Sequence, residues 1–133
     1  MASIDDAIFA RLAASTAVTG LVTTGGVYNL QAAQAATSPF LVFSVLSPNT
    51  VDSADGVTSL TGARLQIDSY GSDKDEARRV ALAVRNNLAD FRGFSASIYV
   101  TRCLGPRTGF AGFEEQTRLY REMREYSLGY YET

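Results

Sequence analysis

The feature that most constrains the fold is a strand, a tight turn and a helix in succession within residues 62–93. In its first part apolar residues such as Leu65 and Ile67 alternate with polar residues. A period of two is typical of a strand with one buried face. After a glycine, either Ser72 or Asp73 can cap a helix, because an acid follows each of them three residues later.

The helix is expected over residues 73–90, and its apolar side chains recur at helical spacing on one side. They are Ala77, Val80, Ala81, Val84, Leu88 and Phe91. This apolar stripe matches the apolar face of the preceding strand. We therefore expect the helix to pack across a sheet that contains Leu65 and Ile67.

The remaining segments predict an α+β fold, with a mostly antiparallel sheet of four to five strands and two helices packed on one face. A capping box of Ser3 and Asp6 begins a short first helix. Further strands are expected over residues 27–30, 40–46, 95–101 and 118–131. The segment 40–46 is apolar throughout, which favours a central strand with both faces covered. In the last strand Glu122 and Arg124 interrupt the apolar parity, which predicts a bulge or an exposed half.

Two segments are expected to be loops. Residues 48–61 are rich in Ser, Thr, Asp and Gly, and they are interpreted as a long hairpin loop. Residues 105–116 hold three glycines and a proline, which predicts an irregular segment. This second loop also carries Phe110 and Phe113, two large apolar side chains that an exposed loop normally avoids.

Composition indicates one globular domain over residues 1–133, of which 46% are hydrophobic. No run approaches the roughly 20 apolar residues of a membrane helix, and the first residues lack the basic start of a signal peptide. A formal net charge of −2 disfavours a protein that mainly grips phosphate backbones. Eleven of the 12 basic residues are arginine, which suits contact surfaces but also follows from genome base composition.

The sequence offers no catalytic residue, no cofactor site and no metal site. It contains no histidine, which removes the Ser-His-Asp and Cys-His arrangements and the usual zinc sites. The single cysteine, Cys103, is interpreted as a structural thiol. Asp52, Asp55 and Gly56 lack the alternate acids and the closing glutamate of a calcium loop. We therefore expect a protein that is not an enzyme.

In their order and spacing, several segments resemble a family of small tail-completion proteins of tailed bacteriophages, also found in prophages and phage-like particles. The matching segments are residues 63–70, 76–77 and 83–88, with 27–28, 39–43, 119–121 and Tyr126. The glycine-rich residues 105–116 and the Ala-rich connector at 31–38 depart from the family pattern. The resemblance implies a tail terminator, which is a structural subunit of the virion tail or neck, assembled in the cytoplasm of a bacterial host.

Such a subunit typically forms a hexameric ring on the end of a finished tail tube and presents a surface to the head connector. The resemblance implies these partners, with DNA passing through the ring without sequence-specific binding and with no membrane contact. A neighbouring neck protein, such as a head-completion or adaptor subunit, is the alternative. A small enzyme or nucleic-acid module is disfavoured by the missing histidines and by the charge balance.

The candidate interface has two parts. Two helices can cover only one face of the sheet, and the other face presents polar residues and tyrosines, which suit partly wet subunit contacts or plain solvation. The interface residues on this face are Arg64, Gln66, Asp68, Tyr70 and Tyr99. The loop contributes Phe110 and Phe113, with Arg107 on its polar rim. The two phenyl rings are expected to insert into a neighbouring subunit or the tail tube, or else to fold back under their own loop.

Overall fold

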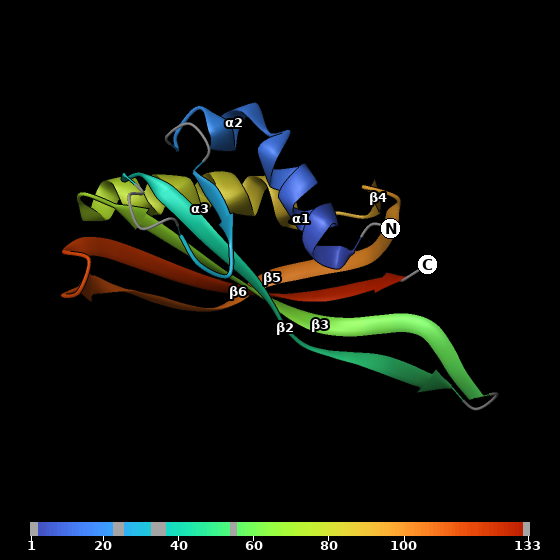
Figure 1. Cartoon of the computed structure of the whole chain (residues 1–133). Helices are drawn as coiled ribbons and strands as arrows, with labels where there is room; N and C mark the ends of the chain where they lie inside the picture. Colours follow the sequence, from blue (N-terminus) through green and yellow to red (C-terminus); the bar gives the residue numbers. More distant parts are fainter. Residues whose placement is uncertain (1–2, 23–25, 33–36, 54–55, 132–133) are drawn as a thin grey trace.

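The structure, a computed structural model, describes residues 3–22, 26–32, 37–53 and 56–131, without the side chains of residues 47, 49–53, 56–59, 107 and 108. Its elements are α1 (Ile4–Ala13), α2 (Thr16–Thr19), β1 (Val27–Asn29), β2 (Phe40–Ser53), β3 (Gly56–Gly71), α3 (Lys74–Leu88), β4 (Gly93–Ser95), β5 (Ile98–Glu114) and β6 (Leu119–Tyr131). The strands form one twisted sheet in the order β1-β2-β3-β6-β5-β4, and the helices lie on one face of it (Figure 1).

The fold class is α+β as expected, but the sheet is larger and more mixed than expected. Six strands are present among the described residues, where four or five were predicted. β1 pairs in parallel with β2, and the other neighbouring strands are antiparallel. The helical layer contains α1, the single turn α2 and the longer α3, where two helices were expected.

The strand, turn and helix at the centre of the chain form as predicted. Asp73 caps α3, since its carboxylate accepts a hydrogen bond from the Glu76 backbone N–H at 2.8 Å. The apolar stripe of α3 is buried against the sheet, where Leu65 and Val84 are at most 1% exposed. At its far end α3 contacts α1 through Arg11, which donates to the Asn87 carbonyl oxygen at 3.0 Å. The segment is therefore the centre of the core.

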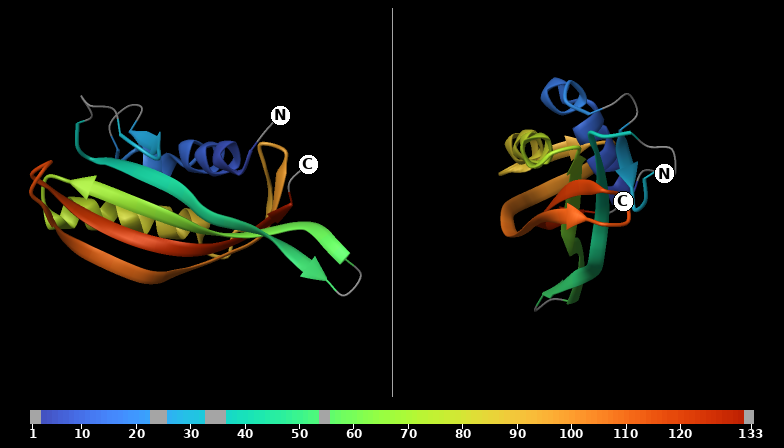
Figure 2. Two further views of the ribbon diagram at one scale, coloured as in Figure 1. Left: turned by 60° about the horizontal axis from the view of Figure 1, so that its bottom comes forward. Right: turned by 90° about the vertical axis from the view of Figure 1, so that its left-hand side faces the viewer.

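The hairpin between β2 and β3 is strand where a loop was expected. β2 continues to Ser53 and β3 begins at Gly56, with Thr50 opposite Thr61 and Asp52 opposite Val57. Gly56 and Val57 pair with β2, and in the described chain β6 pairs with β3 only from Leu60 onward, so the hairpin projects beyond the body (Figure 2). The prediction was wrong because polar β-branched residues in this segment favour strand as readily as loop.

β5 also continues through a segment that was expected to be irregular. Residues 108–114 pair with β6, and only residues 115–118 form a turn. A register shift between Leu104 and Thr108 accommodates the extra residues around Pro106. This part of β5 has no strand on its other side among the described residues, so the missing N–H of the proline breaks no sheet pairing there.

The strand predicted at 95–101 is a hairpin instead. β4 ends at Ser95 and β5 begins at Ile98, and the two residues between them have positive φ angles of 47° at Ala96 and 70° at Ser97. A two-residue hairpin turn requires this backbone, but it is usually built from Asn and Gly. The turn was not predicted, because Ala96 and Ser97 continue the alternation of apolar and polar residues that is typical of a strand.

The last strand neither bulges nor exposes half of its length. β6 pairs with β3 without a register shift from Tyr120 to Tyr131. Glu122 and Arg124 lie on the helix side of the sheet and form an ion pair at 2.7 Å, with Glu122 only 8% exposed. The two charged residues that interrupt the apolar alternation of β6 therefore pair with each other near the start of the strand. They lie beyond the apolar core around Tyr126 and Leu128.

Candidate functional site

The face of the sheet turned away from the helices, here called the open face, carries most of the predicted interface residues (Figure 2). Arg64, Gln66, Asp68 and Tyr70 alternate along β3 with the buried Leu65 and Ile67, so they share this face as predicted. Their partners across β6 are Ser127, Glu125, Met123 and Arg121. The central part of the open face is thus a polar surface spread over two neighbouring strands.

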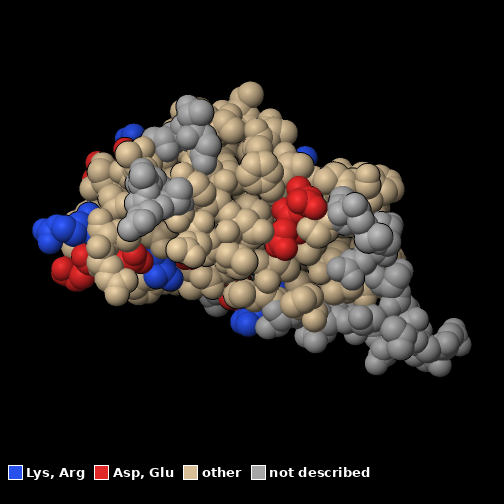
Figure 3. Space-filling view, in the orientation of Figure 1, with Lys and Arg blue, Asp and Glu red and all other residues tan. Residues whose placement is uncertain are grey.

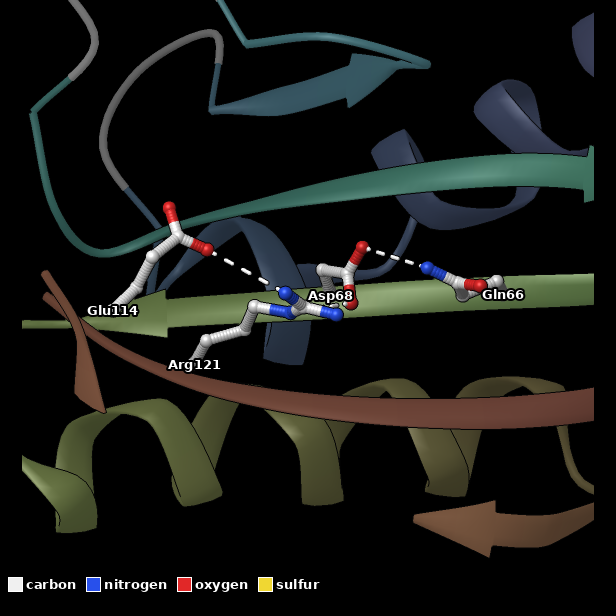
Figure 4. A network of polar contacts seen from close by, with 4 residues as sticks. All are labelled: Gln66, Asp68, Glu114 and Arg121. Carbon is white, nitrogen blue, oxygen red and sulfur yellow. Dashed lines mark hydrogen bonds and ion pairs between the residues drawn. The ribbon is translucent and has the colours of Figure 1, made fainter. Parts of the chain in front are cut away.

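A network of charged side chains joins three strands at one end of the open face (Figure 4). Arg121 from β6 donates through Nε to Asp68 of β3 at 3.1 Å, and its Nη1 lies 3.5 Å from a carboxylate oxygen of Glu114 on β5. The Gln66 amide donates to the other oxygen of Asp68 at 3.1 Å. The guanidinium is held between two carboxylates, so its orientation is fixed before any partner binds.

Burial and charge adjust the protonation of this network. Burial raises the pKa of Tyr70 to about 12, and the nearby carboxylates of Asp68 and Glu114 add to the shift. Burial acts to lower the pKa of Arg121, but Asp68, Tyr70 and Glu114 together outweigh it and raise that pKa above its ordinary value. Near neutral pH the tyrosine is therefore neutral and the arginine charged.

An aromatic cluster extends the open face toward the β1 edge. The Phe40 ring stacks on Tyr70 with centroids 4.8 Å apart and meets Tyr28 edge-on at 6.0 Å. Phe40 is 5% exposed although none of the described helices covers this face. The segment 40–46 was predicted to be buried on both faces. This is confirmed for residues 40–43 at the start of β2, whereas Ser44 to Leu46 are only half-buried.

Phe110 and Phe113 point to opposite faces of the sheet. Phe110 lies opposite Met123 on the open face, is 56% exposed, and has the Arg121 guanidinium carbon 5.8 Å from its ring centroid. Phe113 lies opposite Tyr120 on the helix side, in edge-to-face contact at 5.2 Å. The two rings therefore cannot form one anchor, because they lie on two surfaces. The side chain of Arg107 lies outside the described residues.

Tyr99 belongs to a second aromatic group at the other end of the open face. Its ring meets Phe94 edge-on at 4.9 Å and lies 6.5 Å from Tyr131. Phe94 is 74% exposed, the most exposed of the large apolar side chains described. The predicted residues on this face thus fall into two separate groups, one around Arg121 and one around Tyr99.

Sequence reasoning missed Arg121 as an interface residue, along with the aromatic partners Phe94 and Tyr131. The signal for Arg121 was present, because it has the opposite parity to the buried Tyr126 and Leu128 on the same strand. Phe94 was hidden because the turn after Ser95 was not predicted.

The charged residues are distributed unevenly over the other side of the molecule (Figure 3). They gather toward the end where β3 leads into α3, an acidic group lies over α1, and the area over α2 and β1 is largely uncharged. Between Ala7 and Leu46 the sequence holds a single charged residue, Arg11, whose guanidinium lies 4.0 Å over the Phe91 ring. This side of the molecule therefore shows no continuous basic surface of the kind that grips nucleic-acid backbones.

The described residues offer no cluster of three or more acidic, cysteine or histidine side chains that could bind a metal ion. Cys103 is fully buried, and burial raises the pKa of its thiol to about 12. No helix in the described part of the chain is long and apolar enough to cross a membrane.

A family of known proteins matches the chain. Residues 6–128 match the model of the family described as tail completion protein gp17. The chain belongs to this family. The match spans the helices, the sheet and both ends of the open face. The chain is thus a structural protein of a phage-type tail, in agreement with the resemblance found in its sequence.

The fold also matches a protein chain in a solved particle. A chain in the structure described as the virion of a native gene transfer agent (GTA) particle aligns with a TM-score of 0.74 and 15% sequence identity. The alignment covers 95% of this chain and 92% of that one. At this identity the likeness establishes a common fold. A comparison with curated proteins finds no match.

Proposed function

We propose that this tail completion protein is a tail terminator, which assembles as a hexameric ring on the end of a finished tail tube and joins the tail to the head connector. The observation that carries the proposal is the open face, a sheet surface that no helix covers in the described chain. Membership of the tail completion family supports the placement at the end of a tail.

The open face has the properties of a subunit contact. It combines exposed aromatic side chains, Phe94 and Phe110, with a polar network around Arg121 that is already ordered. Interfaces are enriched in aromatic residues and arginine, and a pre-oriented arginine loses less conformational freedom on binding. An ordinary solvated face needs neither feature. These residues are therefore the proposed interface, together with Arg64, Gln66, Asp68, Tyr70 and Tyr99.

The charges of this face suit a ring through which DNA passes without being held. Two of its basic residues, Arg64 and Arg121, are each close to an acid, at 3.7 Å from Glu125 and 3.1 Å from Asp68. Paired arginines have less positive field available for phosphate groups. We infer that the protein contacts tube and connector proteins and does not bind DNA by sequence.

Deletion of the gene in a particle-producing strain tests the proposal. Electron micrographs should show tails of irregular and mostly excessive length that fail to join heads, and a plasmid copy of the gene should restore normal particles. Tails of normal length that lack heads would instead indicate a neck protein. Normal, head-attached tails in the deletion strain would rule out both roles.

A further inference from the structure

Each side of the sheet ends in a strand that is only partly paired. On one side β1 pairs with residues 41–43 of β2, and the Leu30 N–H closes this pairing by donating to the Phe43 carbonyl oxygen at 2.8 Å. On the other side β4 pairs with residues 98–100 of β5. In the described chain no strand lies on these sides of β2 beyond Phe43 or of β5 beyond Val100. The sheet therefore has two free edges.

The free edge of β5 lies along the far half of the strand. The segment after α3 covers this side as far as Cys103, whose carbonyl oxygen accepts a hydrogen bond from the Asp90 N–H at 2.9 Å. Beyond that point β5 forms the border of the sheet (Figure 2). Natural edge strands are usually protected by proline, by charge or by a bulge. Pro106 and its register shift protect the first part of this edge, but residues 108–113 contain no proline and no charged residue.

Two aromatic side chains flank this unprotected edge, one on each face of the sheet. On the helix side Phe113 packs on Tyr120. On the open face the Phe110 ring packs over Gly112, where a Cβ atom would lie 3.1 Å from its Cζ. Despite these contacts the two phenylalanines are 44% and 56% exposed. A strand added at the edge of β5 would lie beside both rings at once, which a partner on a single face would not do.

The free half of β2 is built in the same way. Val45 lies opposite the buried Leu65 and therefore on the helix side, whereas Leu46 lies opposite Arg64 on the open face. Both apolar side chains are half-buried. A register shift around Pro48 limits the regular part of this edge next to β1 to residues 44–46. Three residues are also the length over which β1 and β4 pair with their neighbours.

The two free edges also agree in direction. β2 is antiparallel to β3, β3 to β6 and β6 to β5, so β2 and β5 run in opposite directions. Two copies placed side by side in the same orientation would therefore pair these edges in antiparallel, the more stable arrangement. The free halves lie at opposite ends of the sheet, one leading to the β2–β3 hairpin and the other to the β5–β6 turn (Figure 1). β5 of one copy would thus fill the place beside β2 that β1 leaves vacant.

We propose that the free edge of β5 in one molecule pairs with the free half of β2 in a second copy of this chain, so that one sheet continues from molecule to molecule. The partner is a second copy because the chain itself carries both halves of the contact, and these agree in strand direction and in the faces of their apolar side chains. The two edges are different surfaces, and contacts of this head-to-tail kind generate rings when their rotation closes.

Pairing at the edges covers neither face of the sheet, so the open face stays available for the contacts proposed above. The inference rests on the proposed function, since it supplies a contact by which the subunits of the ring associate.

The ends of the free segments define the expected register. β1 pairs with β2 up to Phe43, and β5 ends one residue after Phe113, so the longest overlap places Val45 opposite Phe113. These two side chains share the helix side and become direct cross-strand neighbours. Leu46 and Phe110 share the open face and become diagonal neighbours. Pairs of aromatic and aliphatic side chains at such positions stabilise a sheet.

Disulfide cross-linking tests both the contact and its register. Val45→Cys and Phe113→Cys are combined in one chain, and the protein is oxidised alone at high concentration and while bound to purified tail tubes. Within one chain the two positions are three strand spacings apart, roughly 14 Å or more, which is beyond the reach of a disulfide. Ladders of disulfide-linked subunits are therefore expected on a denaturing gel, and only contacts between copies can produce them.

Leu46→Cys combined with Phe113→Cys is the matched control, because these side chains lie on opposite faces of the sheet. It should give no ladder. The single variants Val45→Cys and Phe113→Cys should give none either, since the native Cys103 is fully buried. A double variant without ladders in both settings, or equal ladders from the control, would overturn the proposed contact.

Charge on the β2 edge gives a second test that keeps both phenyl rings in place. Ser44 lies opposite Gln66 on the open face, and in the expected register it faces Glu114 of the neighbouring copy. Ser44→Glu should raise the protein concentration needed for self-association roughly two- to fivefold, because like charges directly opposite each other weaken strand pairing. Ser44→Lys should lower that concentration or leave it unchanged. Sedimentation at several protein concentrations measures both effects, and urea midpoints verify that the variants are folded. Equal association of the two variants would contradict the contact.

The outcome is separable from that of the terminator role. Should the double-cysteine protein cap purified tubes without forming ladders, the copy-to-copy pairing is wrong while the terminator role stands. Wild-type protein that neither associates nor caps tubes, together with normal particles from the deletion strain, would instead contradict the proposed function itself.

Discussion

At the scale of single residues, two buried or half-buried tyrosines are in opposite situations. Tyr126 is fully buried, and its hydroxyl oxygen has no hydrogen-bond partner among the described residues. The Tyr70 hydroxyl lies in the polar network, where a hydrogen bond with Glu114 contributes to its raised pKa. A buried polar group without a partner costs free energy, whereas a satisfied one contributes.

Removing the two hydroxyl groups should therefore change stability in opposite directions. Tyr126→Phe is expected to raise the free energy of unfolding by about 1 kcal/mol, and Tyr70→Phe to lower it by a similar amount. Urea unfolding of the two variants and the wild type measures both changes. A loss of stability in Tyr126→Phe would mean that its hydroxyl is satisfied in solution.

Cys103 and these tyrosines also predict how stability depends on pH. Burial raises the pKa of Cys103 from 9.0 to about 12, so the thiol of the folded protein stays protonated where that of the unfolded chain ionises. The unfolded state then binds fewer protons, and the free energy of unfolding should fall as the pH rises from about 9 toward 12. Tyr70 and Tyr126, whose pKa values are both raised to about 12, add to this fall above pH 10.

The Cys103→Ala variant isolates the contribution of the thiol. At pH values below 9 its free energy of unfolding should be lower than that of the wild type, because a buried group is lost. Between pH 9 and 10 the free energy of unfolding of the variant should fall less steeply with pH than that of the wild type. Thermal unfolding at closely spaced pH values gives the slopes. Equal slopes in the two proteins would show that Cys103 ionises alike in both states.

At the scale of secondary-structure elements, the contact between α3 and the sheet holds the fold together. Val84 of α3 is 1% exposed, and Arg85, the next residue on the same helix, is exposed. Val84→Asp should leave the chain unfolded in the absence of denaturant, because it buries an unpaired carboxylate. Arg85→Asp introduces the same side chain on the solvent side and should cost at most about 1 kcal/mol. Circular dichroism and urea titration of the pair decide the prediction, and similar midpoints would contradict it.

The elements that sequence reasoning located correctly are those in which local signals agree. α3 has a capping residue, Asp73, and a stripe of apolar residues, and β3 alternates beside it, so their type and contact were predictable. The projecting part of the β2–β3 hairpin and the far half of β5 were not, since their strand structure depends on pairing with a partner strand. Local composition around Pro106 indicated a loop, and tertiary pairing overrode it.

The part of the candidate site that lies on a single strand could be predicted from the sequence. Alternation along β3 placed Arg64, Gln66, Asp68 and Tyr70 on one face correctly. The Arg121 network depends on the register between β3, β6 and β5, which a single sequence does not specify. For the same reason Phe110 and Phe113 were grouped together, although an odd separation of three residues along a strand places them on opposite faces.

At the scale of the whole molecule, the proposal divides the surface into a face that is buried in the ring and a side that is not. The open face is the proposed contact, and the outer side of α3 carries exposed arginines for which the described residues provide no ion pair. Because Cys103 is buried, a cysteine introduced at the surface would be the only reactive thiol of the folded protein. A bulky label can therefore be attached at one chosen point.

Labelling on the two sides should affect assembly differently. Ser127→Cys places a thiol on the open face opposite Arg64, and a fluorophore attached there before assembly should prevent ring formation by steric exclusion. Arg79→Cys places the same label on the exposed side of α3, where rings should still form. The unlabelled variants control for the substitutions, and mass photometry reports the size of the assemblies. Rings that tolerate the label at residue 127 but not at residue 79 would show that the helical side is the contact surface, because the label excludes a neighbour only where the two molecules meet.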